Sequence, residues 1–256
     1  MTDRTARALS IHKRKKESRH PGSCRPRRLT GVVALSGKSA MLPVLNRSPQ
    51  TSQIRLHDVE IQAGLRDAKC ELRRPLRLLH EVGEIEDLRD VDGDGQLWQF
   101  RRQFSTDTTD YRLTREALVS RCPYGVAGSF LTVSEAWCWD EETQSVIYRA
   151  DHLTTTQRAD LHRRGMTWKT NTPPPQPNRL VYQIVDCWID HLQPMTPLQL
   201  RNEGWLDNRI KNPKPLELLH IRQAFANHWD RSTLQESSQW RHNPLVWVLS
   251  LQRVSR

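Results

Sequence analysis

Gly128-Ser-Phe-Leu-Thr-Val-Ser-Glu135-Ala-Trp137 is the most informative segment of the chain. Its apolar, β-branched run from Phe130 to Val133 predicts a strand, which carries Glu135 directly into a tryptophan of the kind found in cores. A carboxylate in such surroundings is paired with a cation, kept neutral, or directed at a ligand. Glu135 is therefore the first candidate for a functional residue.

The charge of the 256-residue chain is distributed unevenly. The net charge is +10 at pH 7, and residues 1–50 hold 12 Lys/Arg against 2 Asp/Glu, so the rest of the chain is balanced. We expect a basic, disordered extension over residues 1–50 and a folded domain over residues 51–256. Basic tails can bind nucleic acid non-specifically by releasing counterions, and a tail with no such role is the alternative.

The composition excludes several classes of protein. No stretch offers the roughly 20 unbroken apolar residues that a membrane span needs, and the basic start lacks the apolar segment of a secretory signal. The five cysteines are scattered without a C-x-x-C spacing, which argues against a zinc ribbon and a disulfide framework: Cys24, Cys70, Cys122, Cys138 and Cys187. We therefore expect a cytoplasmic protein without a membrane partner.

No metal site or cofactor is expected from the sequence. The aspartates at Asp90, Asp92 and Asp94 alternate before Gly95 as in a calcium loop, but the twelfth position is Arg101 instead of Glu. A hairpin turn over residues 92–95 is the preferred interpretation. The histidines considered as ligands lack a metal-binding spacing: His191, His220, His228 and His242.

The hydrophobic pattern predicts a mixed α+β fold with a small curved or closed sheet. We expect helices over residues 57–72, 196–204 and 216–229, and strands over residues 144–150, 179–189 and 245–254. In strand 179–189, strict alternation places Ile184 with Trp188 on one face and Val185 with Cys187 on the other. Apolar residues on both faces predict a strand that is covered on both sides.

Separated segments of the chain resemble the phage ASCH domains, which belong to the PUA-like superfamily. Residues 122–125 followed by 128–137 resemble their Cys-Pro-Tyr-Gly … Gly-Asp-x-Leu-Trp-Val-Arg-Glu-Thr-Trp pattern. Residues 67–75 resemble their Lys-Thr-x-Thr-Arg-Arg motif, and residues 148–151 resemble the strand that follows the glutamate. Segments between residues 190 and 248 resemble the closing half, and the similarity spans roughly residues 55–254.

The resemblance implies a PUA-like small β-barrel flanked by helices, with a cleft for RNA or a modified nucleoside. Some small ASCH proteins remove the acetyl group of N4-acetylcytidine with a lysine and a glutamate, positions that match Lys69 and Glu135. In such chemistry a lysine activates a hydroxyl nucleophile and a carboxylic acid protonates the leaving amine. Here Leu72 replaces the nucleophilic threonine and Ser134 replaces the arginine before the glutamate. We therefore expect binding more than catalysis.

Several roles remain open at these positions. The residues expected to contact a ligand are Arg73, Arg74, Ser134, Tyr148 and Arg179. The equal alternative for Lys69 and Glu135 is an ion pair that holds the barrel, and Cys70 is either a substitute nucleophile activated by Lys69 or a structural cysteine. At the level of function, the alternatives are an amidohydrolase of N4-acetylcytidine-like nucleosides and a phage structural or morphogenesis protein.

Overall fold

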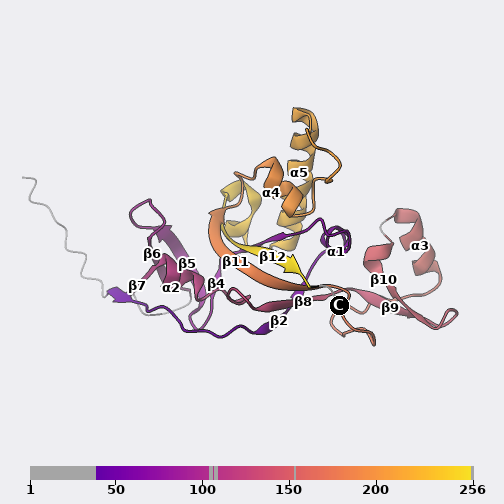
Figure 1. The fold of residues 1–256 in the computed structure, drawn as a ribbon, viewed down its shortest axis with the longest axis horizontal. Coiled ribbons are helices and arrows are strands. Elements are labelled where there is room, and N and C mark those ends of the chain that lie inside the picture. The colour runs from indigo at the N-terminus through magenta and orange to yellow at the C-terminus, as the bar shows by residue number, and fades with distance from the viewer. Residues whose placement is uncertain (1–38, 104–105, 107–108, 153, 255–256) are drawn as a thin grey trace, which may run out of the picture. The chain divides into compact units, whose positions relative to one another are not determined.

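The apolar runs of the chain pair into mixed sheets, as the sequence predicts for an α+β fold (Figure 1). The structure is a computed structural model that describes residues 39–103, 106, 109–152 and 154–254. The chain divides into Met1–Ser36 and Gly37–Arg256, and all described residues belong to the second unit. The predicted disorder and nucleic-acid binding of the tail fall largely on residues outside those described.

The described strands are β1 (Ser39–Met41), β2 (Thr51–Arg55), β3 (Glu71–Pro75), β4 (Leu78–Leu79), β5 (Gly83–Asp90), β6 (Leu97–Arg102), β7 (Asp110–Thr114), β8 (Phe130–Ser134), β9 (Trp137–Asp140), β10 (Ser145–Tyr148), β11 (Val181–His191) and β12 (Leu245–Arg253). The α-helices are α1 (Asp58–Leu65), α2 (Arg115–Val119), α3 (Thr155–Arg163), α4 (Pro197–Asn202) and α5 (Pro215–Ser232). Short 3-10 helices are η1 (Arg149–Asp151), η2 (Glu236–Ser238) and η3 (Trp240–His242).

The central sheet has the order β2-β8-β11-β12-β3, with β2 parallel to β8 and the other pairs antiparallel. A second sheet has the order β1-β7-β6-β5-β4, and β9 and β10 form a hairpin. The turn expected at residues 92–95 joins β5 to β6. Within the described strands neither larger sheet closes on itself, so the expected barrel is not confirmed.

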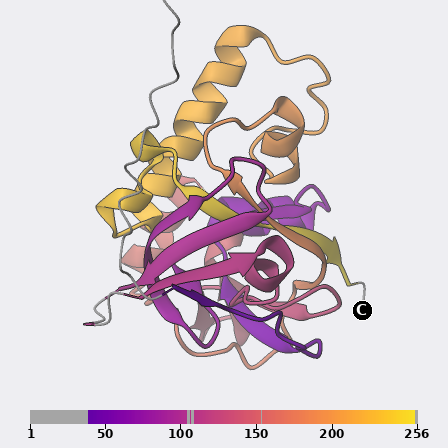
Figure 2. The ribbon, with the colours of Figure 1, turned by 90° about the vertical axis from the view of Figure 1, so that its left-hand side faces the viewer.

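Strand β12 separates two hydrophobic cores because its side chains alternate between faces. Trp247 and Leu249 enter the larger core beneath the central sheet, whereas Val246 and Val248 pack in a smaller core with residues of α4 and α5. Both views of the ribbon place α4 and α5 side by side over this sheet (Figures 1 and 2). The strand expected at residues 245–254 is therefore confirmed, and it is covered on both faces.

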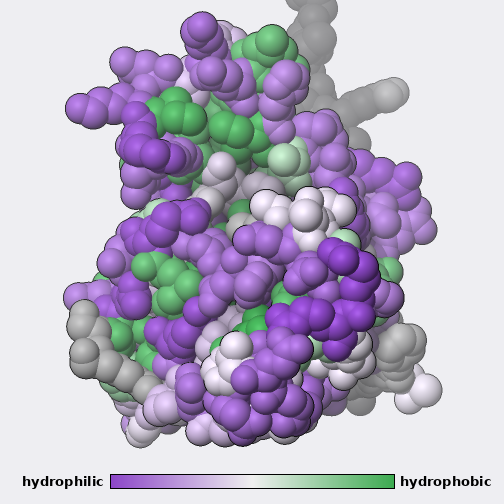
Figure 3. Space-filling model, turned by 90° about the vertical axis from the view of Figure 1, so that its right-hand side faces the viewer, coloured by the Kyte–Doolittle hydropathy of each residue, from purple (hydrophilic) through white to green (hydrophobic). Residues whose placement is uncertain are grey.

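Helix α5 is anchored by only part of its length. Phe225, Ala226 and Trp229 in its second half are buried, whereas Leu216 and Leu219 near its start are exposed. Figure 3 shows hydrophobic surface in the region of α4 and α5, among hydrophilic side chains. The helix begins earlier and ends later than the predicted residues 216–229.

The alternation expected for strand 179–189 is wrong in its second half. The pairing of β11 with β12 shifts register between Ile184 and Asp186, and Val185 is exposed there. Because a bulge adds one residue, it exchanges the faces of all the residues that follow. Cys187 therefore shares the larger core with Ile184, and Trp188 packs against the smaller core.

The helix expected over residues 57–72 is also shorter than predicted. Helix α1 ends at Leu65, Asp67 adopts a left-handed backbone with φ of 55°, and strand β3 begins at Glu71. The motif that contains Lys69 and Arg73 therefore lies in a loop and a strand, not on a helix.

The folded part begins before the expected boundary at residue 50. Strand β1 pairs with β7, the backbone N–H of Leu45 donates to the Ser120 hydroxyl at 3.0 Å, and Arg47 donates to the Cys122 carbonyl at 2.7 Å. Residues 39–50 are thus part of the folded unit, which corrects the prediction of a disordered tail for that segment.

Candidate functional site

The first turn of α1 places a carboxylate beneath the molecular surface. His57 is the N-cap of this helix, and its backbone N–H donates to Oε2 of Glu60 at 2.9 Å. A glutamate three residues after the N-cap can reach back in this way because the first-turn N–H groups have no partner within the helix. The bond fixes Glu60, which is 4% exposed, in a direction set by the start of the helix.

Lys69 joins this carboxylate to a second one. Its Nζ lies 3.3 Å from Oε1 of Glu60 and 2.8 Å from Oε2 of Glu203, and it also donates to the Glu203 backbone carbonyl at 3.1 Å. The Lys69 side chain is fully buried. A buried ammonium requires such pairing because transfer of an unpaired charge out of water is very costly.

Glu203 continues the network to strand β3. Its Oε1 accepts a hydrogen bond from Nη1 of Arg73 at 3.1 Å, and the same Nη1 donates to Oε2 of Glu71 at 3.0 Å. Asn202 holds the other oxygen of Glu71 at 2.7 Å. The result is a buried row of alternating charges, which we call the charge row: Glu60, Lys69, Glu203, Arg73 and Glu71.

Arg73 retains unused hydrogen-bonding capacity. Its side chain is 1% exposed, yet neither Nε nor Nη2 has a hydrogen-bond partner among the described residues. A buried donor without a partner costs about 1–3 kcal/mol. An acceptor supplied by water or by a ligand next to this guanidinium would therefore be bound favourably.

A pocket of about 180 Å³ borders the charge row. Its volume is far above the roughly 10–15 Å³ that one water needs and below the roughly 300–1,000 Å³ of sites for larger ligands. The lining combines cationic, aromatic and hydroxyl side chains with the two carboxylates: Arg55, His57, Glu60, Arg73, Arg74, Pro75, Glu203, Phe225, His228, Trp229, Ser232 and Thr233. The pocket can therefore hold a small polar ligand with an apolar side.

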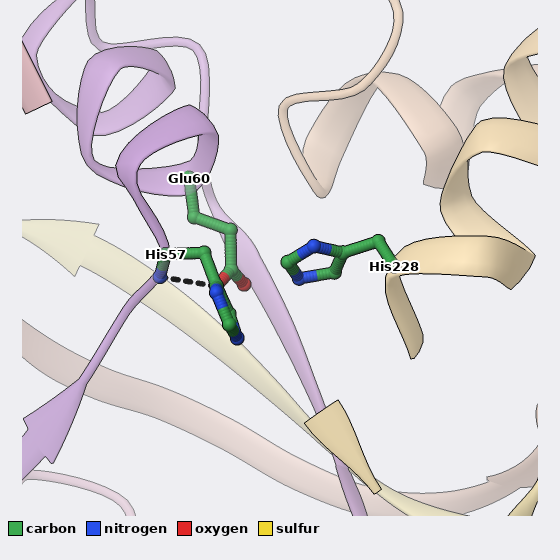
Figure 4. A group of neighbouring side chains, drawn as sticks. All are labelled: His57, Glu60 and His228. Atoms are coloured by element: carbon green, nitrogen blue, oxygen red, sulfur yellow. Dashed lines mark hydrogen bonds between the residues drawn. The ribbon is translucent and has the colours of Figure 1, made fainter. Parts of the chain in front are cut away.

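Two histidines from distant parts of the chain meet at this pocket. His57 at the start of α1 and His228 on α5 point toward one another, and the Glu60 carboxylate lies beside the His57 ring (Figure 4). Their ring centroids lie 4.1 Å apart with an interplanar angle of 83°. One nitrogen of each ring and one carboxylate oxygen of Glu60 all lie within 4.8 Å of one another.

The protonation states of these three groups follow from their surroundings. Burial lowers the pKa of His57, and burial together with the nearby His57 lowers the pKa of His228 to about 4. Burial alone would raise the pKa of Glu60, but Lys69 and Arg74 outweigh it and lower this pKa to about 2. At neutral pH the pocket therefore presents two neutral imidazoles beside one carboxylate.

Glu135 lies in a different ionic cluster. Nε of Arg179 donates to Oε1 of Glu135 at 3.1 Å, and Nη2 pairs with its other oxygen. Nη1 of Arg179 lies 2.8 Å from Asp151, and the guanidinium stacks 3.8 Å above the Tyr148 ring. Burial, followed by the charge of Glu135, raises the pKa of Tyr148.

Lys69 and Glu135 therefore do not form the ion pair that was one of the two alternatives for them. Among the described residues, Lys69 pairs with Glu60 and Glu203, and Glu135 pairs with Arg179. Of the predicted residues, Arg73 and Arg74 line the pocket and Lys69 is buried in the charge row. Glu135, Tyr148 and Arg179 form the second cluster.

The Ser134 hydroxyl and the Cys70 thiol were both considered as functional groups, and the contacts of each favour a structural role. The Ser134 hydroxyl accepts a hydrogen bond from the Gln53 side chain on the neighbouring strand β2. Burial, followed by the charge of Glu71, raises the pKa of Cys70, which is opposite to the activation expected from Lys69. The direction of this pKa shift gives no support to Cys70 as a substitute nucleophile.

The sequence reasoning missed His57, Glu60 and Glu203, and it assigned no site role to His228. The spacing His57-x-x-Glu60 was a usable signal, because residues three apart lie on one face of a helix. Nothing local could have indicated His228 or Glu203, since they reach the pocket only through the packing of α4 and α5.

Comparison of the chain with protein families, with curated proteins and with solved structures finds no match. None of the helices in the described part of the chain has both the length and the apolar character to cross a membrane.

Proposed function

We propose that the folded unit is a PUA-like domain of the ASCH type that binds RNA or a nucleotide at the pocket beside Arg73, without hydrolysing it. The observation that carries the proposal is the buried Arg73 guanidinium at the pocket, which keeps two nitrogens without a partner among the described residues. Under this proposal, the central sheet β2-β8-β11-β12-β3 corresponds to the β-barrel of the PUA-like family.

The chemistry of the pocket supports a phosphorylated or carbonyl-bearing ligand. Arg55 and Arg74 lie beside Arg73 on the lining, and guanidinium groups donate in a fork that fits phosphate oxygens and base carbonyls. Phe225 and Trp229, which are 3% and 4% exposed, form the apolar side of the pocket. Together these groups could bind the two chemically different ends of a nucleotide.

The ion pairs favour binding over the amidohydrolase alternative. Lys69 is held between Glu60 and Glu203, so it is not available to take a proton from a nucleophile. Leu72, at the position of the family's threonine, is 1% exposed and has no nucleophilic atom. The carboxylate that would protonate a leaving amine, Glu135, is engaged by Arg179.

Fluorescence anisotropy with labelled short RNA and competition by free nucleotides tests the proposal on the full chain. Arg74→Ala and Arg55→Ala each remove one cation from the pocket lining; Arg74 also lies 3.7 Å from Oε1 of Glu60, so circular dichroism must first establish that this variant is folded. Arg163→Ala, on the exposed face of α3, is the control. We expect at least about tenfold weaker binding in the two pocket variants and no change in the control, as for loss of a charged hydrogen bond.

Three results would oppose the proposal. A folded wild-type protein that binds neither RNA nor nucleotide at low salt would overturn it, as would equal losses in all three variants. Release of cytidine from N4-acetylcytidine by the wild type would contradict the non-hydrolytic part.

A further inference from the structure

The cluster of His57, Glu60 and His228 has the donor atoms of a metal centre. Imidazole nitrogen and carboxylate oxygen are the usual ligands of zinc and of other first-row divalent ions, and two histidines with one glutamate form a known ligand set. A histidine and a glutamate three positions apart at one end of α1 present their ligand atoms to the same side of the helix. His228 approaches from α5 and completes the triangle (Figure 4).

The positions of the three side chains fit an ion with open coordination positions. Their ligand atoms lie within 4.8 Å of one another, and a tetrahedral zinc with bonds of about 2.0–2.1 Å would bring them to roughly 3.4 Å. Rotation of the exposed His57 ring can provide much of this adjustment. The adjoining pocket leaves space for water or a ligand on the remaining side of an ion.

Independent observations set His228 apart from an ordinary surface histidine. Within the described part of the chain, no hydrogen bond involves its ring nitrogens, although the residue is half-buried. The Trp205 ring lies 5.0 Å from the imidazole, and this packing restricts the orientation of the His228 ring. A ring that is positioned by packing but has unused nitrogens is suited to bind an ion.

The charges around the cluster are balanced before an ion binds. Lys69 and Arg74 lie near Oε1 of Glu60 and oppose a further cation. Glu203 and Glu71 offset them, since each forms ion pairs within the charge row. A carboxylate has about four acceptor positions, so Glu60 can keep its contacts with Lys69 and the His57 backbone and still offer a lone pair to a metal.

We infer that His57, Glu60 and His228 bind a divalent transition-metal ion, for which Zn²⁺ and Co²⁺ are suitable probes. The three residues line the same pocket as the arginines of the proposed nucleotide site, but metal binding depends on the two imidazoles and Glu60 and does not require that proposal to hold.

The test is titration of the chelator-treated full chain with Zn²⁺ by calorimetry, and with Co²⁺ by visible absorption, in the absence of nucleotide. The variants are His57→Asn, which keeps a good N-cap residue, and His228→Ala, which keeps a good helix former. His220→Ala is the control, because His220 is exposed on the same helix. Circular dichroism establishes that each variant is folded.

We expect one equivalent of metal in the wild type and in His220→Ala, and at least about tenfold weaker binding in the other two variants. The Co²⁺ absorption bands should disappear with either ligand histidine. Equal binding by all four proteins, or no binding by folded wild type, would overturn the inference. Because nucleotide is absent, this result is separate from the outcome of the RNA experiment.

Discussion

At the scale of single residues, Glu203 is the central acid of the charge row. One of its oxygens pairs with Lys69 and the other accepts a hydrogen bond from Arg73. Both cations are almost completely buried, so neither can replace this partner with water. The stability of the row therefore depends more on Glu203 than on any surface charge.

We predict that Glu203→Gln lowers the free energy of unfolding by about 3–5 kcal/mol, because it leaves two buried cations short of one negative charge. Glu236→Gln is the matched control, since Glu236 pairs with Arg241 on the surface with side chains 76% and 62% exposed. That change should cost less than about 1 kcal/mol. Urea unfolding measures both, and similar small losses would contradict the importance of the row.

A second prediction concerns pH and His228. In the unfolded chain the His228 imidazole has its ordinary pKa of 6.5, whereas in the folded protein its pKa is lowered to about 4. Between these values the unfolded state binds more protons, so stability should fall as the pH drops from about 6.5 to about 4. His57 acts in the same direction.

His228→Asn should reduce the slope of unfolding free energy against pH in that window, measured by urea unfolding in the presence of a chelator. His220→Asn, a change to an exposed histidine on the same helix, should leave the slope as in wild type. An unchanged slope in His228→Asn would show that the imidazole titrates alike in both states.

The sequence predicts the residue types of the pocket better than their partners. Lys69, Arg73 and Arg74 are close in sequence, and each lies within ion-pair distance of Glu60 or Glu203. Glu203, the partner of Lys69, is 134 positions away, so no local pattern could connect them. The alternative that paired Glu135 with Lys69 failed for the same reason.

At the scale of elements, α3 and α4 end in the same way with different surroundings. Gly165 and Gly204 each follow the C-cap residue of a helix with a left-handed backbone, at φ of 71° and 84°. A Cβ on Gly204 would lie 2.3 Å from Cβ of Ala63 on α1, whereas a Cβ on Gly165 would meet nothing within 4 Å. Alanine substitutions at these two glycines therefore distinguish the cost of backbone strain from the cost of a steric clash.

We predict that Gly165→Ala costs about 1–2 kcal/mol, the penalty of the left-handed backbone alone. Gly204→Ala should cost about 1–3 kcal/mol more, because α1 and α4 must move apart. Thermal and urea unfolding of both variants measure the difference. Equal losses would mean that the contact between α1 and α4 adapts without cost.

The ends of a helix were predictable where local capping residues mark them. The Thr196-Pro197 start and Gly204 end of α4 are as expected, since capping residues act locally. The bulge in β11 was not predictable, because register is fixed by the partner strand and not by alternation within the strand.

At the scale of the whole molecule, the start of the folded unit can be located by truncation. Removal of residues 1–36 should leave the melting temperature unchanged, because the folded unit begins at Gly37. Removal of residues 1–50 should lower it by at least about 5 °C, because β1 and the contacts of Arg47 are lost. Differential scanning fluorimetry compares the two, and equal melting temperatures would show that residues 37–50 contribute nothing.

The α+β class was predictable from hydrophobic patterning, but the arrangement of the sheets was not. The two parallel pairs, β1 with β7 and β2 with β8, join strands that are far apart in sequence. Such pairs leave no turn signal, unlike the hairpin formed by β5 and β6.

The charge row also constrains the order in which the chain can assemble. Its members come from α1, the loop that follows it, β3 and the end of α4, so the row is complete only after the long loop to α4 has been closed against the entropy of the chain. Until then the charged side chains would lack their full set of partners and would be more stable in contact with water. The row can therefore complete only late in folding, and any partial unfolding that releases α4 would hydrate it again.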